Sequence, residues 1–384
     1  MNLHKAAYQW AKRPADERFW TIREARDHAE AVRARTYEAG ETFDALRVEA
    51  SDGGLVLRTP SSQPYNVTHW SFGQLCQRVA APASYLRTLP ATLAAQNLNH
   101  GLAHRAGGDA QMLVRQGENG EAPTLRALTS DVYSRLWDVE VLSRCLALEE
   151  RGWKVPPARP ALGLADDRAR PATAEDVLRG NAHSLAIREG DMIAPAGIYV
   201  SDRDAFVFLV DEKTRVDDGT EAGLMRGVFV TNSEVGASSL RLTCFLFRAV
   251  CGNHIVWDAR NVLDVRLRHR GNIEERAWRA FRTDVQRYLE ASATEEEGLI
   301  RAAKRLTLGA TREAVIEAAA KVTGLSERVL GQAYADVRDD VDGDPSTAWG
   351  LAQGLTRYSQ LATKNQDQRD QVDRAAGRLV ELAA

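Results

Sequence analysis

The sequence predicts an α+β protein in which an antiparallel, hairpin-rich sheet with packed helices is followed by a C-terminal helical region. Short segments rich in β-formers and divided by turn residues are densest between Leu224 and Val265, and strands this close in sequence pair as antiparallel hairpins. Beyond Asn272 apolar residues recur three and four positions apart, which is the spacing of amphipathic helices. We therefore expect a central sheet with helices after it.

Composition divides the chain into four parts. Residues 1–152 mix helical and hairpin patterns and are predicted to form an N-terminal α/β portion. Residues 153–180 are crowded with Pro, Ala and Arg, a composition typical of an extended, linker-like segment. Residues 181–271 are the predicted central antiparallel β portion, and residues 272–384 the C-terminal helical region.

The N-terminal portion is predicted to begin with a helix over Glu17–Ala39, because its apolar residues approximate a 3.6-residue period. Two hairpins follow, with turns at residues 51–54 and at Asn119-Gly120, whose sequences suit tight turns with positive φ. Ser130-Asp131 is a candidate cap for a helix over Val132–Arg151.

The central portion is predicted to hold a hairpin over Gly197–Val210 and then three strands. These are Gly227–Thr231, Ser238–Phe247 and Ile255–Trp257, separated by a loop over Asn232–Gly236 and a tight turn. The helical region is predicted to contain six helices: Ile273–Ala291, Glu295–Leu308, Thr311–Val322, Ser326–Val337, Thr347–Ala362 and Asp367–Leu382.

The overall composition is that of a soluble globular protein. Its 384 residues have a formal net charge of −3, with 44% hydrophobic and 27% charged residues. No apolar run approaches the roughly 18 residues of a membrane span, and the N-terminus lacks the apolar core of a signal peptide, so we expect a cytoplasmic protein that contacts no membrane. The four cysteines form no metal-binding spacing and are expected to be buried free thiols.

Signatures of common enzymes are absent from the sequence. There is no GxxxxGK[ST] phosphate loop, no GxGxxG before a helix, no HExxH and no GxSxG. The sequence therefore offers no catalytic residues, no cofactor site and no metal site, and a non-enzymatic role is favoured.

Arginines gather just beyond the apolar centre of the chain. Arg266, Arg268 and Arg270 occupy alternate positions, so in a strand they point to one face. Together with Arg241, and with Trp257 as a surface for base stacking, this row could follow a phosphate backbone. The alternative is a solvated sheet face, because acidic residues lie close by in the sequence.

The segment Asn232–Gly236 is longer than the connection between two strands requires. Asn232 and Glu234 are candidates for contact with a ligand or another subunit. The alternative is a plain turn in which Asn and Gly adopt positive φ and Glu234 is exposed. Arg248 lies among apolar residues, so it is predicted to be buried and paired, and Glu234 is its candidate partner.

Several segments carry a family resemblance: NSEVG and LRLTCFLFRAVCGN in the centre, SFGQLCQR and LRALTSDVYSRLWD before it, and STAWGLAQGLTRYSQ near the C-terminus. In this order, over nearly the whole chain, the sequence resembles a family of phage and plasmid proteins known as a domain of unknown function. One departure is His254, where the pattern has glycine. The resemblance implies a role in DNA metabolism and, at fold level only, similarity to single-strand annealing proteins of recombination.

The expected function is therefore single-stranded nucleic-acid binding or annealing by a non-enzymatic homo-oligomer of a phage or plasmid element, with single-stranded DNA as its partner. One alternative is an assembly or host-interaction protein that binds no nucleic acid, which the near-neutral charge favours. The other is an enzyme of unrecognised type, with Asn232, Glu234 and His254 around a pocket.

Overall fold

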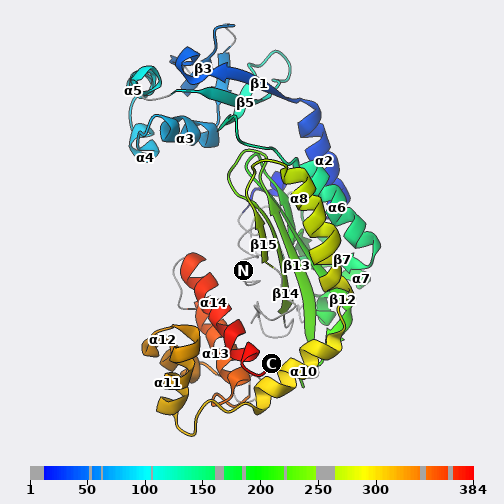
Figure 1. Cartoon of the computed structure of the whole chain (residues 1–384). Helices are drawn as coiled ribbons and strands as arrows, with labels where there is room; N and C mark the ends of the chain where they lie inside the picture. The colour runs from blue at the N-terminus through cyan, green and yellow to red at the C-terminus, as the bar shows by residue number, and fades with distance from the viewer. Residues whose placement is uncertain are drawn as a thin grey trace.

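The computed structural model describes residues 13–51, 54–61, 64–104, 107–160, 168–183, 187–219, 223–247, 264–337, 343–361 and 366–384. Figure 1 shows three bodies that follow one another along a crescent: an N-terminal sheet at the top, a central sheet in the middle and the C-terminal helices at the bottom. Antiparallel sheets with packed helices and a helical C-terminal region confirm the predicted α+β class.

The N-terminal sheet has six strands, antiparallel except for one parallel pair, β4 with β6. Helices α3 (His69–Arg78), α4 (Ala83–Leu86) and α5 (Ala91–His104) bury their apolar residues in the core of this sheet. In sheet order the strands are β1 (Thr36–Thr42), β5 (Asp109–Arg115), β6 (Thr124–Ser130), β4 (Pro64–Val67), β3 (Gly54–Arg58) and β2 (Arg47–Ser51). The two predicted hairpins are β2–β3 and β5–β6.

The central sheet is antiparallel throughout, as the hairpin pattern predicts. Its strands, in order, are β11 (Ile198–Val200), β12 (Ala205–Val216), β13 (Leu224–Asn232), β14 (Leu240–Phe247) and β15 (Asp264–Leu267), with β7 (Trp153–Lys154) paired to part of β12. The predicted strand over Ile255–Trp257 lies outside the described residues.

The two faces of the central sheet have different chemistry because side chains alternate along each strand. One face is mainly aliphatic and packs against the helices α2 (Ile22–Ala34), α6 (Asp138–Glu150), α8 (Ile273–Arg279) and α9 (Gln286–Glu290), the last two joined by a π-helical turn, η3 (Ala280–Val285). The other face is an aromatic cluster of Tyr199, Phe206, Phe208, Phe229, Phe245 and Phe247. A Cβ at Gly227 would lie 2.6 Å from the Phe245 ring, so this position requires glycine.

The segment over residues 153–180 is more ordered than the predicted linker. Trp153 is 5% exposed and lies in the aliphatic core. Short strands β8 (Arg159–Pro160) and β9 (Arg170–Pro171) flank β10 (Met192–Ala194). Helix α7 (Ala174–Ala182) begins at Thr173, whose side chain accepts a hydrogen bond from the Asp176 amide. Pairing with distant strands supplies order that the local composition does not indicate.

The C-terminal helices pack around a core that includes the fully buried Trp349. They are α10 (Ala293–Arg305), α11 (Arg312–Thr323), α12 (Glu327–Ala335), α13 (Ala348–Leu361) and α14 (Gln366–Glu381). With α8 and α9 they occupy the predicted helical ranges. No helix in the described ranges has the length and apolar content of a membrane span.

Two predicted helices are shorter than the sequence indicates. The first begins only at Ile22, because Thr21 caps it by accepting from the Glu24 amide, and residues 36–42 form β1 instead of continuing the helix. The helix predicted from Val132 begins at Asp138, because Ser130 ends strand β6. Pairing with β5 overrides the helical pattern over residues 36–39, whereas residues 131–137 form a turn and an isolated bridge between Tyr133 and Arg270. Short 3₁₀ turns cover Ala15–Glu17 (η1) and Phe43–Ala45 (η2).

Candidate functional site

The predicted arginine row lies on and just after β15, which among the described strands pairs only with β14. Arg266, Arg268 and Arg270 are exposed, while His269 between them is buried. In the part of the chain that the structure describes, these three guanidinium groups make no ion pair and no hydrogen bond. The row therefore presents three positive charges to solvent.

Arg241 is in a different position from the rest of the row. It faces Arg266 across the β14–β15 pair, but its guanidinium group donates two hydrogen bonds to Asp264, at 2.8 and 2.9 Å. Burial alone would raise the pKa of Asp264, yet the Arg241 hydrogen bonds and charge leave that pKa below its ordinary value. Arg241 is thus engaged with a carboxylate. Trp257 lies outside the described residues.

His269 has its imidazole against the Tyr133 ring, with the ring centroids 5.3 Å apart. Burial lowers the pKa of His269 to about 4, below the value of about 6.5 for an unfolded chain.

The free energy of unfolding should therefore fall by up to about 3 kcal/mol between pH 6.5 and pH 4, because the unfolded state takes up the proton on His269 first. Urea unfolding of the wild type and His269→Leu at several pH values checks this, with the exposed His100→Leu as the matched control. A His269→Leu protein with an unchanged pH profile would contradict it.

The loop Asn232–Gly236 is not an exposed turn. Glu234 is 3% exposed; one carboxylate oxygen accepts a hydrogen bond from Arg126 Nη1 at 2.8 Å, and the other accepts from the Asp138 amide at 2.9 Å. Arg126 on β6 is therefore a partner of Glu234. The predicted partner, Arg248, lies outside the described residues. The side-chain amide of Asn232 donates to Asp138 Oδ1 at 2.7 Å.

Other contacts fix the same loop between the N-terminal and central sheets. The Val235 carbonyl accepts hydrogen bonds from Trp70 Nε1 at 2.9 Å and from Gln74 Nε2 at 2.8 Å, both on α3. The Val235 side chain is fully buried with Leu113 and Ala127 of the N-terminal sheet. Gly236 has a φ of +80°, which only glycine adopts without strain. The loop is a structural joint, and Glu234 is its charged centre.

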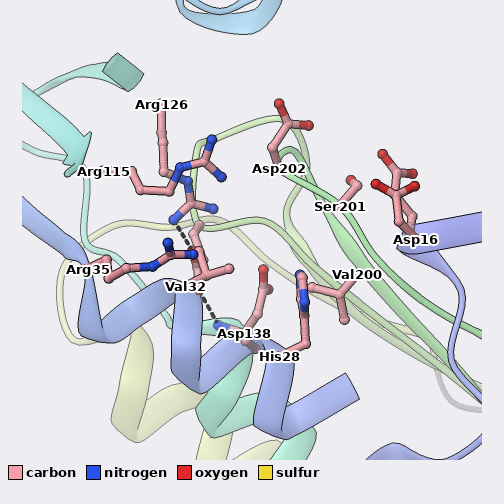
Figure 2. A pocket seen from close by; sticks show the side chains of 13 residues that line it. Asp16, His28, Val32, Arg35, Arg115, Arg126, Asp138, Val200, Ser201 and Asp202 are labelled. Atoms are coloured by element: carbon pink, nitrogen blue, oxygen red, sulfur yellow. Dashed lines mark hydrogen bonds and ion pairs between the residues drawn. The ribbon is translucent and has the colours of Figure 1, made fainter. Parts of the chain in front are cut away.

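A pocket of about 310 Å³ opens at this joint. Figure 2 shows the guanidinium groups of Arg35, Arg115 and Arg126 together on one side, with Ser201, Asp202 and Asp16 on the other. His28 and Asp138 lie between the two sides. The remaining lining residues are Glu17, Ala29, Val32, Val200 and Glu234. The pocket is therefore polar: arginines lie on one side, where Glu234 pairs with Arg126, and Asp16 and Asp202 lie on the other.

Two groups in this pocket have shifted pKa values. Burial lowers the pKa of Arg115, and the nearby charges of Arg126 and Arg35 lower it further. Burial raises the pKa of Asp138 well above its ordinary value, and the neighbouring Glu234 carboxylate adds to the effect. Like charges thus crowd one another at this junction, a property common at functional sites.

Sequence reasoning selected Glu234 and Asn232 but missed the three arginines and Asp138. The predicted hairpin at Asn119-Gly120 already placed Arg115 and Arg126 on adjacent strands, so a signal for that pair existed. Among the described residues, no group of three or more His, Cys, Asp or Glu side chains has a metal-binding arrangement. His254, the third residue of the enzyme alternative, and Cys251 lie outside the described residues; Cys76, Cys145 and Cys244 are buried.

Comparison with known proteins gives one result. Residues 172–381 match the family model DUF932, described as a domain of unknown function. No curated protein and no solved structure matches the chain. The matched segment runs from just before α7 to the end of α14. It contains strands β10 to β15 and the C-terminal helices, and it covers more than half of the sequence. The chain belongs to the DUF932 family.

Proposed function

We propose that this protein binds single-stranded nucleic acid, without catalysis, along the arginine row of β15. The supporting observation is that Arg266, Arg268 and Arg270 are exposed and free of ion pairs in the described structure, whereas Arg241 beside them is bound to Asp264. Arg266 lies on β15, and Arg268 and Arg270 follow it directly, and we expect each of the three side chains to contact a separate phosphate group. Cytoplasmic location, a phage or plasmid origin and assembly into a homo-oligomer belong to this proposal.

The test is the triple variant Arg266→Ala/Arg268→Ala/Arg270→Ala, measured by fluorescence anisotropy with a labelled single-stranded DNA. We expect an affinity loss of at least about tenfold at low salt, and a decrease of about 2 in the slope of log affinity against log salt, since each phosphate contact on a single strand contributes about 0.7. Binding of ordinary strength by this variant would contradict the proposal.

A matched control removes the same charge elsewhere. Arg23, Arg301 and Arg328 are exposed arginines on α2, α10 and α12, and their triple alanine variant should bind DNA as the wild type does. Light scattering in parallel measures the oligomer. A defined oligomer with no affinity for DNA at low salt would select the assembly or host-interaction function instead.

A further inference from the structure

The arginine side of the pocket at the joint holds one guanidinium group, that of Arg115, without a carboxylate partner in the described structure. Arg126 is paired with Glu234, and Arg35 with Glu118, whose side chain is 62% exposed. The side chain of Arg115 makes no ion pair and no hydrogen bond in the described structure. Two carboxylates therefore face three guanidinium groups on this side of the pocket, and a bound anion can neutralise the remaining positive charge.

The number of donors indicates which anion fits. Each guanidinium group offers five N–H donors in a planar fork, and Glu234 accepts only from Nη1 of Arg126 in the described structure. A phosphate group presents three terminal oxygens and a charge near −2, so it can accept from several arginines at once. Arg35, Arg115 and Arg126 converge from the end of α2, from β5 and from β6, an arrangement that suits a phosphate group.

The opposite side of the pocket requires a different kind of group. Asp16 and Asp202 are exposed carboxylates without an ion pair or hydrogen bond in the described ranges. They repel a phosphate group and accept hydrogen bonds from hydroxyl groups. Ala29, Val32 and Val200 supply apolar wall between the two sides. A volume of about 310 Å³ is at the lower end of small-molecule sites.

We propose that this pocket binds a small phosphorylated polyol, a sugar phosphate, with its phosphate group on Arg35, Arg115 and Arg126 and its hydroxyl groups on Asp202 and Asp16. This site is separate from the arginine row of β15 and does not depend on nucleic-acid binding. The ligand contacts the N-terminal sheet through Arg115 and Arg126, and the β11–β12 loop of the central sheet through Asp202. Binding therefore also stabilises the joint between the two bodies.

The test uses isothermal titration calorimetry of the full chain with three probes: ribose 5-phosphate, inorganic phosphate and ribose. We expect ribose 5-phosphate to bind with a Kd of about 1 mM or tighter, inorganic phosphate to bind at least about tenfold more weakly, and ribose to give no saturable heat. The melting temperature should rise with ribose 5-phosphate, since a ligand that binds only the folded state stabilises it. No saturable binding of ribose 5-phosphate up to about 10 mM would overturn the proposal.

Two variants separate the two ends of the ligand. Arg115→Ala should weaken both ribose 5-phosphate and inorganic phosphate by at least about tenfold, equivalent to about 1.4 kcal/mol. Asp202→Ala should weaken ribose 5-phosphate alone and leave inorganic phosphate as tight as before or tighter. Neither side chain makes an ion pair or hydrogen bond in the described structure, so both variants are expected to fold, and circular dichroism verifies that.

The controls distinguish this site from the arginine row. Arg266→Ala should leave ribose 5-phosphate binding unchanged, and Arg115→Ala should leave single-stranded DNA binding unchanged. Equal ribose 5-phosphate affinity in Arg115→Ala and the wild type, or equal loss in Arg115→Ala and Arg266→Ala, would overturn the pocket assignment. Equal affinity in Asp202→Ala and the wild type would overturn the two-ended ligand.

Discussion

Glu234→Ala should lower the free energy of unfolding by about 3–5 kcal/mol, because it leaves a buried arginine without its counter-charge. Arg126 and Glu234 are each only 4% exposed at the side chain and lie 2.8 Å apart. The substitution also removes the acceptor of the Asp138 amide, the first residue of α6. Urea unfolding followed by tryptophan fluorescence measures the loss, since Trp70 and Trp137 pack beside this loop.

The matched control is a pair with the same chemistry at the surface. Arg58 and Glu49 lie 2.5 Å apart with side chains 39% and 48% exposed, and Glu49→Ala should cost less than about 1 kcal/mol. In the double variant Arg126→Met/Glu234→Leu no buried charge remains unpaired, so much of the stability should return. A Glu234→Ala loss as small as that of Glu49→Ala would show that Arg126 is solvated in solution.

The fold was predictable wherever local chemistry decides. Asn119-Gly120 fixed the β5–β6 hairpin, where both residues have positive φ, and the spacing of apolar residues located the C-terminal helices. The prediction failed where a distant strand competes with a local pattern. Residues 36–39 belong to a predicted helix, yet they form part of β1 because β5, more than sixty residues away, pairs with all seven residues of that strand.

The candidate site was less predictable than the fold. Glu234 was selected because its loop is long, but its partner Arg126 lies 108 positions away, and no turn rule or periodicity connects the two. Arg35 and Asp202 reach the pocket from a helix end and from a hairpin loop, so only the packing of the two sheets brings them together. The arginine row was visible because its members occupy alternate positions in the sequence, although only Arg266 of the three lies on β15.

A second buried ion pair connects the central sheet with the C-terminal helices. Arg226 on β13 donates to Glu296 on α10 at 2.6 Å and to the Ala291 carbonyl at 2.6 Å. The two side chains are 3% and 4% exposed. Like the pair at the Glu234 joint, it lies where two bodies meet, so its loss should weaken the attachment of one body to the next.

Arg226→Met should therefore destabilise the chain by about 3–5 kcal/mol at pH 8, because Glu296 stays buried without a counter-charge. Burial already raises the pKa of Glu296 although Arg226 opposes that effect, so removing Arg226 raises this pKa further. A carboxyl group with a raised pKa in the folded state stabilises the fold when protonated, and that stability is lost as pH rises through the pKa. The loss should accordingly be smaller at pH 5 than at pH 8.

Urea unfolding of Arg226→Met at the two pH values measures this difference. Adding Glu296→Gln removes the unpaired charge, so the double variant should regain stability at pH 8 and lose the pH dependence. Lys321→Met is the matched control, because Lys321 and Glu317 form an ion pair with side chains 73% and 69% exposed, and its cost should be below about 0.5 kcal/mol. An Arg226→Met loss that is equal at both pH values would mean that Glu296 does not take up a proton, so that the cost comes from packing around the lost guanidinium group.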